Sequence, residues 1–249
     1  MTQVKKNTKI SKKFTSNTLQ SIVESLAGAV FKLQWKLPFT EWGNYYENTN
    51  YSYEAAIAKK ELVDSMLAAI GKPLHIVQDL GANTGEFSYI AAKYADVVVS
   101  QDVDPVAVER NYCTQRDGKT VNIIPLLQNL FSPSPAIGFG NCERYSFVER
   151  GRCDVILALA LVHHLAISNN TPLAMVASLF AQLGNYLIIE FVPKSDSQVK
   201  RLLETRKDIF PNYTQEDFEV VFREYFSIEK KEMVPGTERT MYLMRKKAI

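Results

Sequence analysis

The chain has 249 residues, 46% of them hydrophobic, and a net charge of +2 at neutral pH. This length and composition suit one sizeable core with a small appendage, and the low charge argues against a strong global field for nucleic acid. The cysteines Cys113, Cys142 and Cys153 lack the C-x-x-C spacing of a disulfide framework or zinc site. No signal peptide and no apolar run of about 20 residues occurs, so we expect a reduced, cytoplasmic protein without a membrane partner or a metal.

The first 72 residues differ in pattern from the rest of the chain. Residues 1–13 hold five lysines and are expected to form a flexible basic tail. Apolar residues at helical spacing predict helices over 14–35 and 53–71, joined by an aromatic-rich connector. We therefore expect 14–72 to form an N-terminal helical cap on a domain that comprises 73–249.

Strand and helix patterns alternate from His75 onward. Five strands are predicted, over 75–80, 97–101, 121–127, 154–162 and 185–191. Helices are predicted over 85–95, from Asp104-Pro105 onward, and over 172–183, 196–207 and 214–225. The late runs 226–234 and 239–246 can pair antiparallel. This order is typical of a doubly wound α/β sheet, whose ligands bind where the strand order reverses, and we expect the first strand at that point.

The turn after the first predicted strand is the most informative segment, Asp79-Leu80-Gly81-Ala82-Asn83-Thr84-Gly85. Its glycines allow a sharp turn and a close approach to a ligand. A dinucleotide fingerprint that starts at Gly81 requires glycine where the chain has Asn83 and Glu86. A carboxylate at the helix start repels a pyrophosphate but tolerates S-adenosylmethionine (SAM), which carries a sulfonium and an ammonium. The turn therefore favours SAM over a nicotinamide dinucleotide.

Polar residues also end the second and third predicted strands. Asp102 stands 21 residues after Gly81, where a carboxylate can accept two hydrogen bonds from a ribose, and Asp104 is expected to cap the next helix. The segment Gln128-Asn129-Leu130 can contact adenine. The alternatives are a surface carboxylate for Asp102 and a turn without ligand for 128–130.

The acceptor is expected at the ends of the fourth and fifth strands. His163 and His164 follow the fourth, and an imidazole there can remove a proton because its ordinary pKa lies near working pH. The alternative is that one histidine packs or caps a helix while the other faces solvent. Glu190 ends the fifth strand, where it either orients a histidine or acts as the base itself.

The aromatic connector before residue 53 allows two interpretations. Its rings either fasten the cap to the domain, which we expect for Trp35 and Phe39, or line a lid over the acceptor. The lid interpretation suits the tyrosines, so we predict that the acceptor contacts Tyr45, Tyr46 or Tyr51.

These motifs resemble those of the class I SAM-dependent methyltransferases. The resemblance is carried by 79–85, by Gln101-Asp102-Val103-Asp104-Pro105 and by Leu161-Val162-His163-His164-Leu165. Further segments are similar to the bacterial nodulation-protein (NoeA-like) methyltransferases, namely Leu33-Gln34-Trp35, Asn44-Tyr45-Tyr46 and Ile189-Glu190-Phe191-Val192-Pro193-Lys194.

The resemblance implies a Rossmann-like sheet of seven strands in the order 3-2-1-4-5-7-6, with strand seven antiparallel. It places Gly81 and Gly85 beside the amino-acid portion of SAM, with Asp79 nearby, and Asp102 on the ribose. Asn129 stands where the family often has an adenine-reading aspartate. The complete predicted set of cofactor contacts is Asp79, Gly81, Asn83, Gly85, Asp102, Val103, Asn129, Leu130 and Ala158.

Missing motifs narrow the expected substrate. The fourth strand ends in neither Asn/Asp-Pro-Pro-Tyr nor Pro-Cys, and Glu190-Phe191 replaces the Asp-Asn pair of the metal-dependent catechol type. We therefore predict methyl transfer to a small-molecule O-, N- or C-nucleophile. A non-catalytic SAM-binding module and a nucleic-acid methyltransferase that uses the lysine tail are the alternatives, and a nucleic-acid partner is not expected.

Overall fold

The computed structural model describes residues 15–40, 43, 51–118 and 122–248. The chain divides into two compact units, Met1–Pro38 and Phe39–Ile249. The first contains helix α1 (Ser16–Phe31), which begins after Thr15, whose Oγ1 accepts a hydrogen bond of 3.2 Å from the Thr18 amide. The larger unit contains the remaining helices and all the strands, and helix α2 (Tyr53–Ala69) belongs to it.

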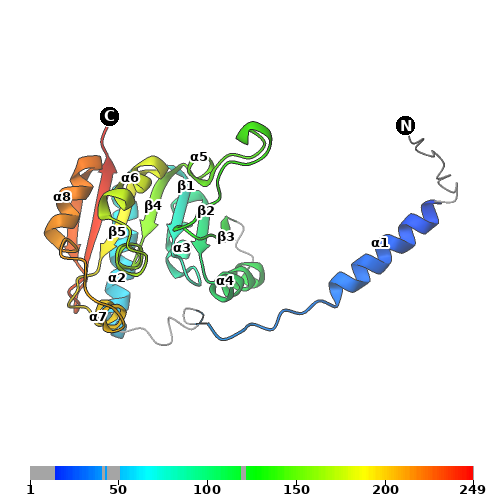
Figure 1. Ribbon diagram of the computed structural model, residues 1–249, viewed down its shortest axis with the longest axis horizontal. Helices are drawn as coiled ribbons and strands as arrows, with labels where there is room; N and C mark the ends of the chain where they lie inside the picture. Colours follow the sequence, from blue (N-terminus) through cyan, green and yellow to red (C-terminus); the bar gives the residue numbers. More distant parts are fainter. Residues whose placement is uncertain (1–14, 41–42, 44–50, 119–121, 249) are drawn as a thin grey trace, which may run out of the picture. The chain divides into compact units, whose positions relative to one another are not determined.

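The larger unit is built on a seven-stranded sheet in the order β3-β2-β1-β4-β5-β7-β6 (Figure 1). Strand β7 is antiparallel to both β5 and β6, whereas β1 to β5 are parallel. The predicted fold class and strand order are thus confirmed. The strands are β1 (Leu74–Leu80), β2 (Ala95–Asp102), β3 (Ile123–Leu127), β4 (Cys153–Ala158), β5 (Gly184–Phe191), β6 (Phe226–Met233) and β7 (Thr240–Lys246).

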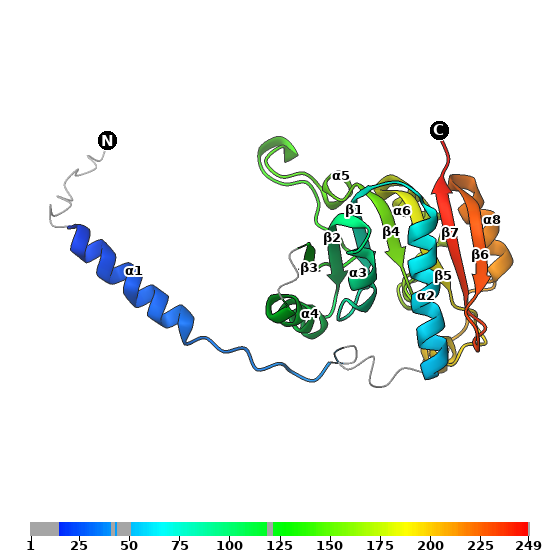
Figure 2. The ribbon, with the colours of Figure 1, turned by 180° about the vertical axis from the view of Figure 1, so that it is seen from behind.

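Helices cover both faces of this sheet (Figures 1 and 2). One face packs Val63 and Met66 of α2 and Phe87 of α3 against β1, β2 and β4. The opposite face packs Phe180 of α6 and Phe222 of α8 against β4 and β5. The helices after α2 are α3 (Glu86–Ala91), α4 (Pro105–Gly118), α5 (Phe147–Arg150), α6 (Leu173–Leu183), α7 (Ser197–Glu204) and α8 (Gln215–Tyr225).

Several segments depart from the predicted elements, among them the helix predicted over 85–95, which ends at Ala91, four residues before β2 begins at Ala95. The predicted strand 154–162 ends at Ala158, because Ala160 has φ +48°, in the left-handed region that no strand continues through. The short helix α5 was not predicted, although Ser146 and Glu149 form a capping box at its start. In the described ranges no helix combines the length and apolar character that a membrane span requires.

A candidate cofactor and acceptor site at the carboxyl edge of the sheet

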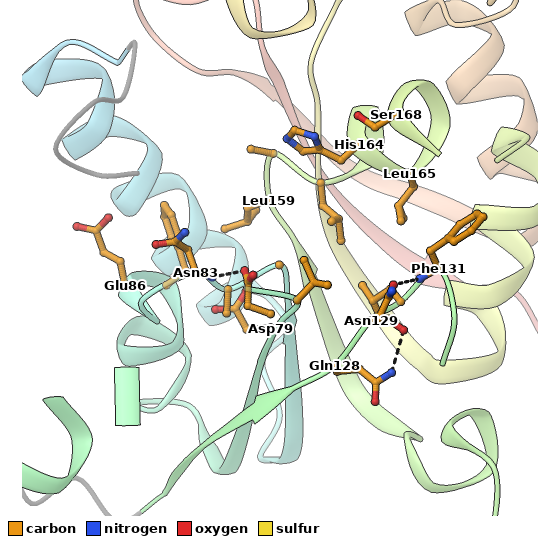
Figure 3. Close-up of a pocket in the computed structure, with 18 of the residues that line it drawn as sticks. Asp79, Asn83, Glu86, Gln128, Asn129, Phe131, Leu159, His164, Leu165 and Ser168 are labelled. Atoms are coloured by element: carbon orange, nitrogen blue, oxygen red, sulfur yellow. Dashed lines mark hydrogen bonds between the residues drawn. The ribbon is translucent and has the colours of Figure 1, made fainter. Parts of the chain in front are cut away.

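A cavity of about 410 Å³ lies at the carboxyl ends of β1 to β4. In Figure 3, Asn83 and Glu86 from the turn after β1 stand on one side of it, and the residues that follow β3 stand on another. His164 and Ser168, from a π-helical turn η3 (His164–Ser168), lie at a third side. The site is therefore at the reversal of strand order between β1 and β4, where a doubly wound sheet binds its ligand.

The turn after β1 needs glycine for two different reasons. Gly81 and Gly85 have φ +73° and +85°, which L side chains rarely adopt. A Cβ on Gly81 meets Leu161 Cδ1 at 3.1 Å, whereas one on Gly85 lies 2.6 Å from the side-chain amide of Asn111. That amide is buried and donates to Ser100 Oγ at 2.7 Å, so it cannot move aside freely.

We predict that Gly85→Ala lowers the free energy of unfolding by about 2 to 4 kcal/mol, from left-handed strain and overpacking together. Gly71→Ala is the matched control, because Gly71 has φ +66° but a Cβ there meets only the Ala69 carbonyl oxygen, at 3.8 Å. Gly71→Ala measures the cost of the left-handed backbone alone, and it should lower the free energy of unfolding by about 1 kcal/mol. Urea denaturation of both variants measures the difference. Equal losses of unfolding free energy would show that the Asn111 side chain moves aside for the new methyl group.

Asp79 is the penultimate residue of β1 and places a buried carboxylate on the wall of the cavity. Its Oδ2 accepts a hydrogen bond of 2.6 Å from Ser88 Oγ. Burial raises the pKa of Asp79 to about 7, and the charge of Asp102 adds to the rise. A buried carboxylate of this kind calls for a positive partner, and the nearby charge of Lys59 lowers the pKa of Asp79 only in part.

Asp102 ends β2 with both carboxylate oxygens held by backbone amides. Oδ2 accepts from the Asn83 amide and Oδ1 from the Asp104 amide, each at 2.8 Å. Each oxygen can still accept a second hydrogen bond. Together they can therefore bind the two hydroxyls of a ribose. The predicted cap of α4 is confirmed, since Asp104 Oδ1 accepts from the Val106 amide at 2.8 Å.

The segment after β3 presents more apolar than polar surface to the cavity. Asn129 Oδ1 accepts hydrogen bonds from the Phe131 amide at 2.9 Å and the Ser132 amide at 3.3 Å. The amide oxygen is thus used in the turn, and the Nδ2 donor remains for a ligand. Leu130 and Phe131 add apolar walls beside it.

Four charged side chains and one tyrosine, buried or partly buried, form a connected group that we call the Glu190 cluster: Glu190, Lys59, Arg239, Asp196 and Tyr51. Glu190 is fully buried, and its Oε2 lies 2.7 Å from Lys59 Nζ. Tyr51 Oη donates to Glu190 Oε1 and accepts from Arg239 Nη1 at 2.6 Å. Arg239 binds Asp196 through Nε at 2.7 Å and Nη2 at 3.0 Å.

The charges of this cluster decide how Glu190 ionises. Burial by itself raises the pKa of Glu190, but Lys59 and Arg239 outweigh burial and hold the pKa below its ordinary value. Oε2 also accepts the Ala160 amide at 2.7 Å, which fixes the left-handed residue after β4. An ionised carboxylate with these partners is a poor proton acceptor, so the geometry assigns Glu190 to charge compensation rather than to the predicted base role.

The two histidines lie together but differ in access, with ring centroids 4.1 Å apart. His164 lines the cavity, whereas His163 is buried, and its Nδ1 finds no hydrogen-bond partner among the described residues. Burial and then Arg239 lower the pKa of His164 to about 4, and the pKa of His163 lies well below its ordinary value. The expectation of an imidazole that titrates near working pH is therefore wrong, because burial and neighbouring cations disfavour the imidazolium.

The cavity brings together most of the predicted residues that the structure describes. Its lining includes Asp79, Gly81, Asn83, Asp102, Val103, Asn129, Leu130, His164 and Tyr51. Gly85, Ala158, His163 and Glu190 lie outside that lining, and Tyr45 and Tyr46 lie outside the described residues. Phe39, which we expected to pack, is largely exposed in the larger unit, and Trp35 belongs to the smaller unit.

Sequence reasoning missed Lys59 and Arg239. Lys59 carried a signal, because it falls on the buried stripe of α2 with Ala55, Val63 and Met66 at helical spacing. A lysine on such a stripe needs a buried counter-charge. Arg239 immediately precedes β7 and has no comparable pattern in the sequence.

No family model matches the chain. It is 39% identical over 203 residues to nodulation protein NoeA of Rhizobium meliloti (strain 1021), which is 81% of this chain and 42% of that protein. The chain thus spans less than half the length of this curated relative.

Solved structures share its fold. Magnesium protoporphyrin IX methyltransferase (ChlM) of Synechocystis PCC 6803 with bound S-adenosylhomocysteine (SAH) has a TM-score of 0.56 at 18% identity, over 92% of this chain and 99% of that one. The 16S rRNA methylase RmtB has a TM-score of 0.54 at 17% identity, over 94% and 76%. At these identities the likeness concerns the fold.

Proposed function

We propose that this chain, a relative of nodulation protein NoeA with the fold of the class I SAM-dependent methyltransferases, transfers a methyl group from SAM to a small-molecule acceptor. One observation carries the proposal. The left-handed glycine turn, buried Asp79 and Asp102 converge on one cavity at the reversal of strand order. Two carboxylates in that place suit a cationic nucleoside better than a phosphorylated one.

The residues of the cavity fit SAM part by part. Asp102 retains acceptor capacity on both oxygens for the ribose, and Leu130 and Phe131 supply apolar walls for adenine. Asp79 supplies a buried carboxylate for an ammonium. Glu86 begins α3, where a pyrophosphate otherwise binds, and pairs with Lys60.

When bound, SAM supplies an electrophilic methyl group at its sulfonium. The chain's own contribution is to hold the acceptor in line with that group, and positioning supplies much of the acceleration in such a displacement. We propose that His164, a neutral imidazole on the cavity wall, accepts a hydrogen bond from the acceptor. Leu161 and Leu165 form the apolar part of this wall.

Calorimetric titration with SAM, beside NADH, tests the proposal. We expect saturable SAM binding that Asp102→Ala weakens about 10- to 100-fold, because two charge-assisted hydrogen bonds are lost. Asp117→Ala, at an exposed carboxylate near the end of α4, is the control and should leave SAM affinity unchanged. Absence of SAM binding, or tighter binding of NADH, would overturn the proposal.

The acceptor class needs a second measurement. Release of SAH with small-molecule acceptors, followed by mass spectrometry, supports an enzyme, and binding without turnover across the screen supports a SAM-binding module. Binding of RNA that weakens steeply with salt supports a nucleic-acid methyltransferase instead, since phosphate contacts release counterions. The lysine tail invoked for that alternative lies outside the described residues.

A further inference from the structure

Lys59 is a buried cation on the wall of the proposed SAM cavity. Its side chain is 6% exposed and stands on the face of α2 that packs against the sheet. Nζ lies 4.9 Å from the centre of the Tyr51 ring and 5.0 Å from that of Phe87. These contacts fix the ammonium in place without neutralising it.

The hydrogen bonds of Lys59 leave one donor unused. An ammonium has three N–H groups, and those of Lys59 reach Glu190 Oε2 at 2.7 Å and Tyr51 Oη at 3.2 Å. In the described part of the chain, no third acceptor for Nζ is found. Tyr51 Oη itself donates to Glu190 and accepts from Lys59 and Arg239, which occupies its proton and both lone pairs. Lys59 and Tyr51 both line the cavity, and of these two Lys59 is the one with an N–H group left to donate to a ligand.

A carboxylate of opposite charge shares the cavity with this ammonium. Asp79 lines the same cavity and interacts electrostatically with Lys59. A cation and an anion that line one cavity match the two ends of an amino-acid zwitterion, whose ammonium suits Asp79 and whose carboxylate suits Lys59. Neither side chain alone makes this match.

We infer that Lys59 donates a charge-assisted hydrogen bond to the carboxylate of the cofactor's amino-acid end, while Asp79 receives the ammonium. The inference rests on the proposed function. Glu190 and Tyr51 then act as positioning residues, because both bond Lys59 Nζ, and Arg239 in turn bonds Tyr51 Oη. An ionised oxygen of the acceptor presents the same chemistry to Lys59, so the test must separate the two sources.

Three ligands without an acceptor make the test independent of turnover. SAH carries the whole amino-acid end, decarboxylated SAH lacks only the carboxylate, and 5′-methylthioadenosine lacks the entire amino-acid end. With Lys59→Met, calorimetry should show SAH affinity reduced about 10- to 100-fold and affinity for both other ligands unchanged. Lys93→Met is the control, since Lys93 is exposed and pairs with Asp64, and it should change none of the three affinities.

Lys59→Met leaves Glu190 short of a counter-charge, so folding is checked in two ways. The first check is that methylthioadenosine binding is unchanged, which shows an intact nucleoside site. The second is the double variant Lys59→Met with Glu190→Gln, which removes both charges and should bind SAH as weakly as Lys59→Met alone. Equal loss for SAH and decarboxylated SAH overturns the inference. The inference is also overturned if Lys59→Met shows a defect only when an acceptor is present, because that result assigns Lys59 to the acceptor oxygen. If the unsubstituted protein binds no SAH, the proposed function itself fails.

Discussion

Glu190→Gln is expected to lower the free energy of unfolding by about 3 to 5 kcal/mol, because it leaves buried cations uncompensated. Lys59 Nζ lies 2.7 Å from Glu190 Oε2 and loses this counter-ion. Arg239 Nη1 lies 3.7 Å from Oε1 and loses this partner as well, while it keeps its ion pair with Asp196. The amide keeps the size of the carboxylate, so the effect is one of charge rather than of volume. Urea denaturation at pH 7 measures it.

The control is Glu229→Gln, because Glu229 pairs with Arg245 where both side chains are partly exposed. A surface pair contributes about 0 to 1 kcal/mol, so little stability should be lost. Adding Lys59→Met to Glu190→Gln should recover part of the loss, as expected for two coupled charges. If Glu190→Gln instead abolished turnover and left stability and SAH affinity intact, the base role would return.

Asp79→Asn is expected to stabilise the protein at neutral pH and to weaken its hold on SAH. The pKa of Asp79 rises from 3.8 to about 7 on folding, so the native state binds more protons and stability falls as pH rises across that interval. At 1.36 kcal/mol per pKa unit, keeping Asp79 ionised and buried at pH 8 lowers the free energy of unfolding by up to about 4 kcal/mol. The difference in unfolding free energy between variant and parent should grow from pH 4 to pH 7 and then level.

The same carboxylate should make SAH affinity depend on pH. Only ionised Asp79 pairs with an ammonium, so affinity in the parent should fall about tenfold for each pH unit below about 7. The Asn variant should bind SAH weakly with a flat profile, and 5′-methylthioadenosine should give a flat profile with both proteins. Parallel SAH profiles in parent and variant would remove Asp79 from the ammonium site.

The placement of the residues proposed to bind the nucleoside was predictable, because the sequence signals that mark them are local. Gly81 and Asp102 each stand at the end of a strand whose apolar run is plain in the sequence, and parallel strands bring their carboxyl ends to one edge. The fold order followed from the family resemblance and is confirmed. The helix cap at Asp104 followed from its position before Pro105 and is confirmed as well.

The charge pattern at the acceptor end was not predictable in the same way. Glu190 was recognised as a buried carboxylate that needs a partner, but Lys59 and Arg239 reach it from α2 and from the start of β7. The ionisation of His164 depends on burial and on Arg239, neither of which sequence spacing reveals. The end of β4 was misplaced because nothing marks Ala160 as left-handed except its bond to Glu190.

The bond between Tyr51 and Arg239 joins positions 188 residues apart in the chain. During synthesis, Lys59 and Glu190 leave the ribosome before Arg239 does, so the cluster is completed only after residue 239 has emerged. The strands that carry Asp79 and Asp102 are adjacent and close early by comparison. A nascent chain can therefore form the proposed nucleoside pocket first, and the charged end of the site forms only after Arg239 has emerged.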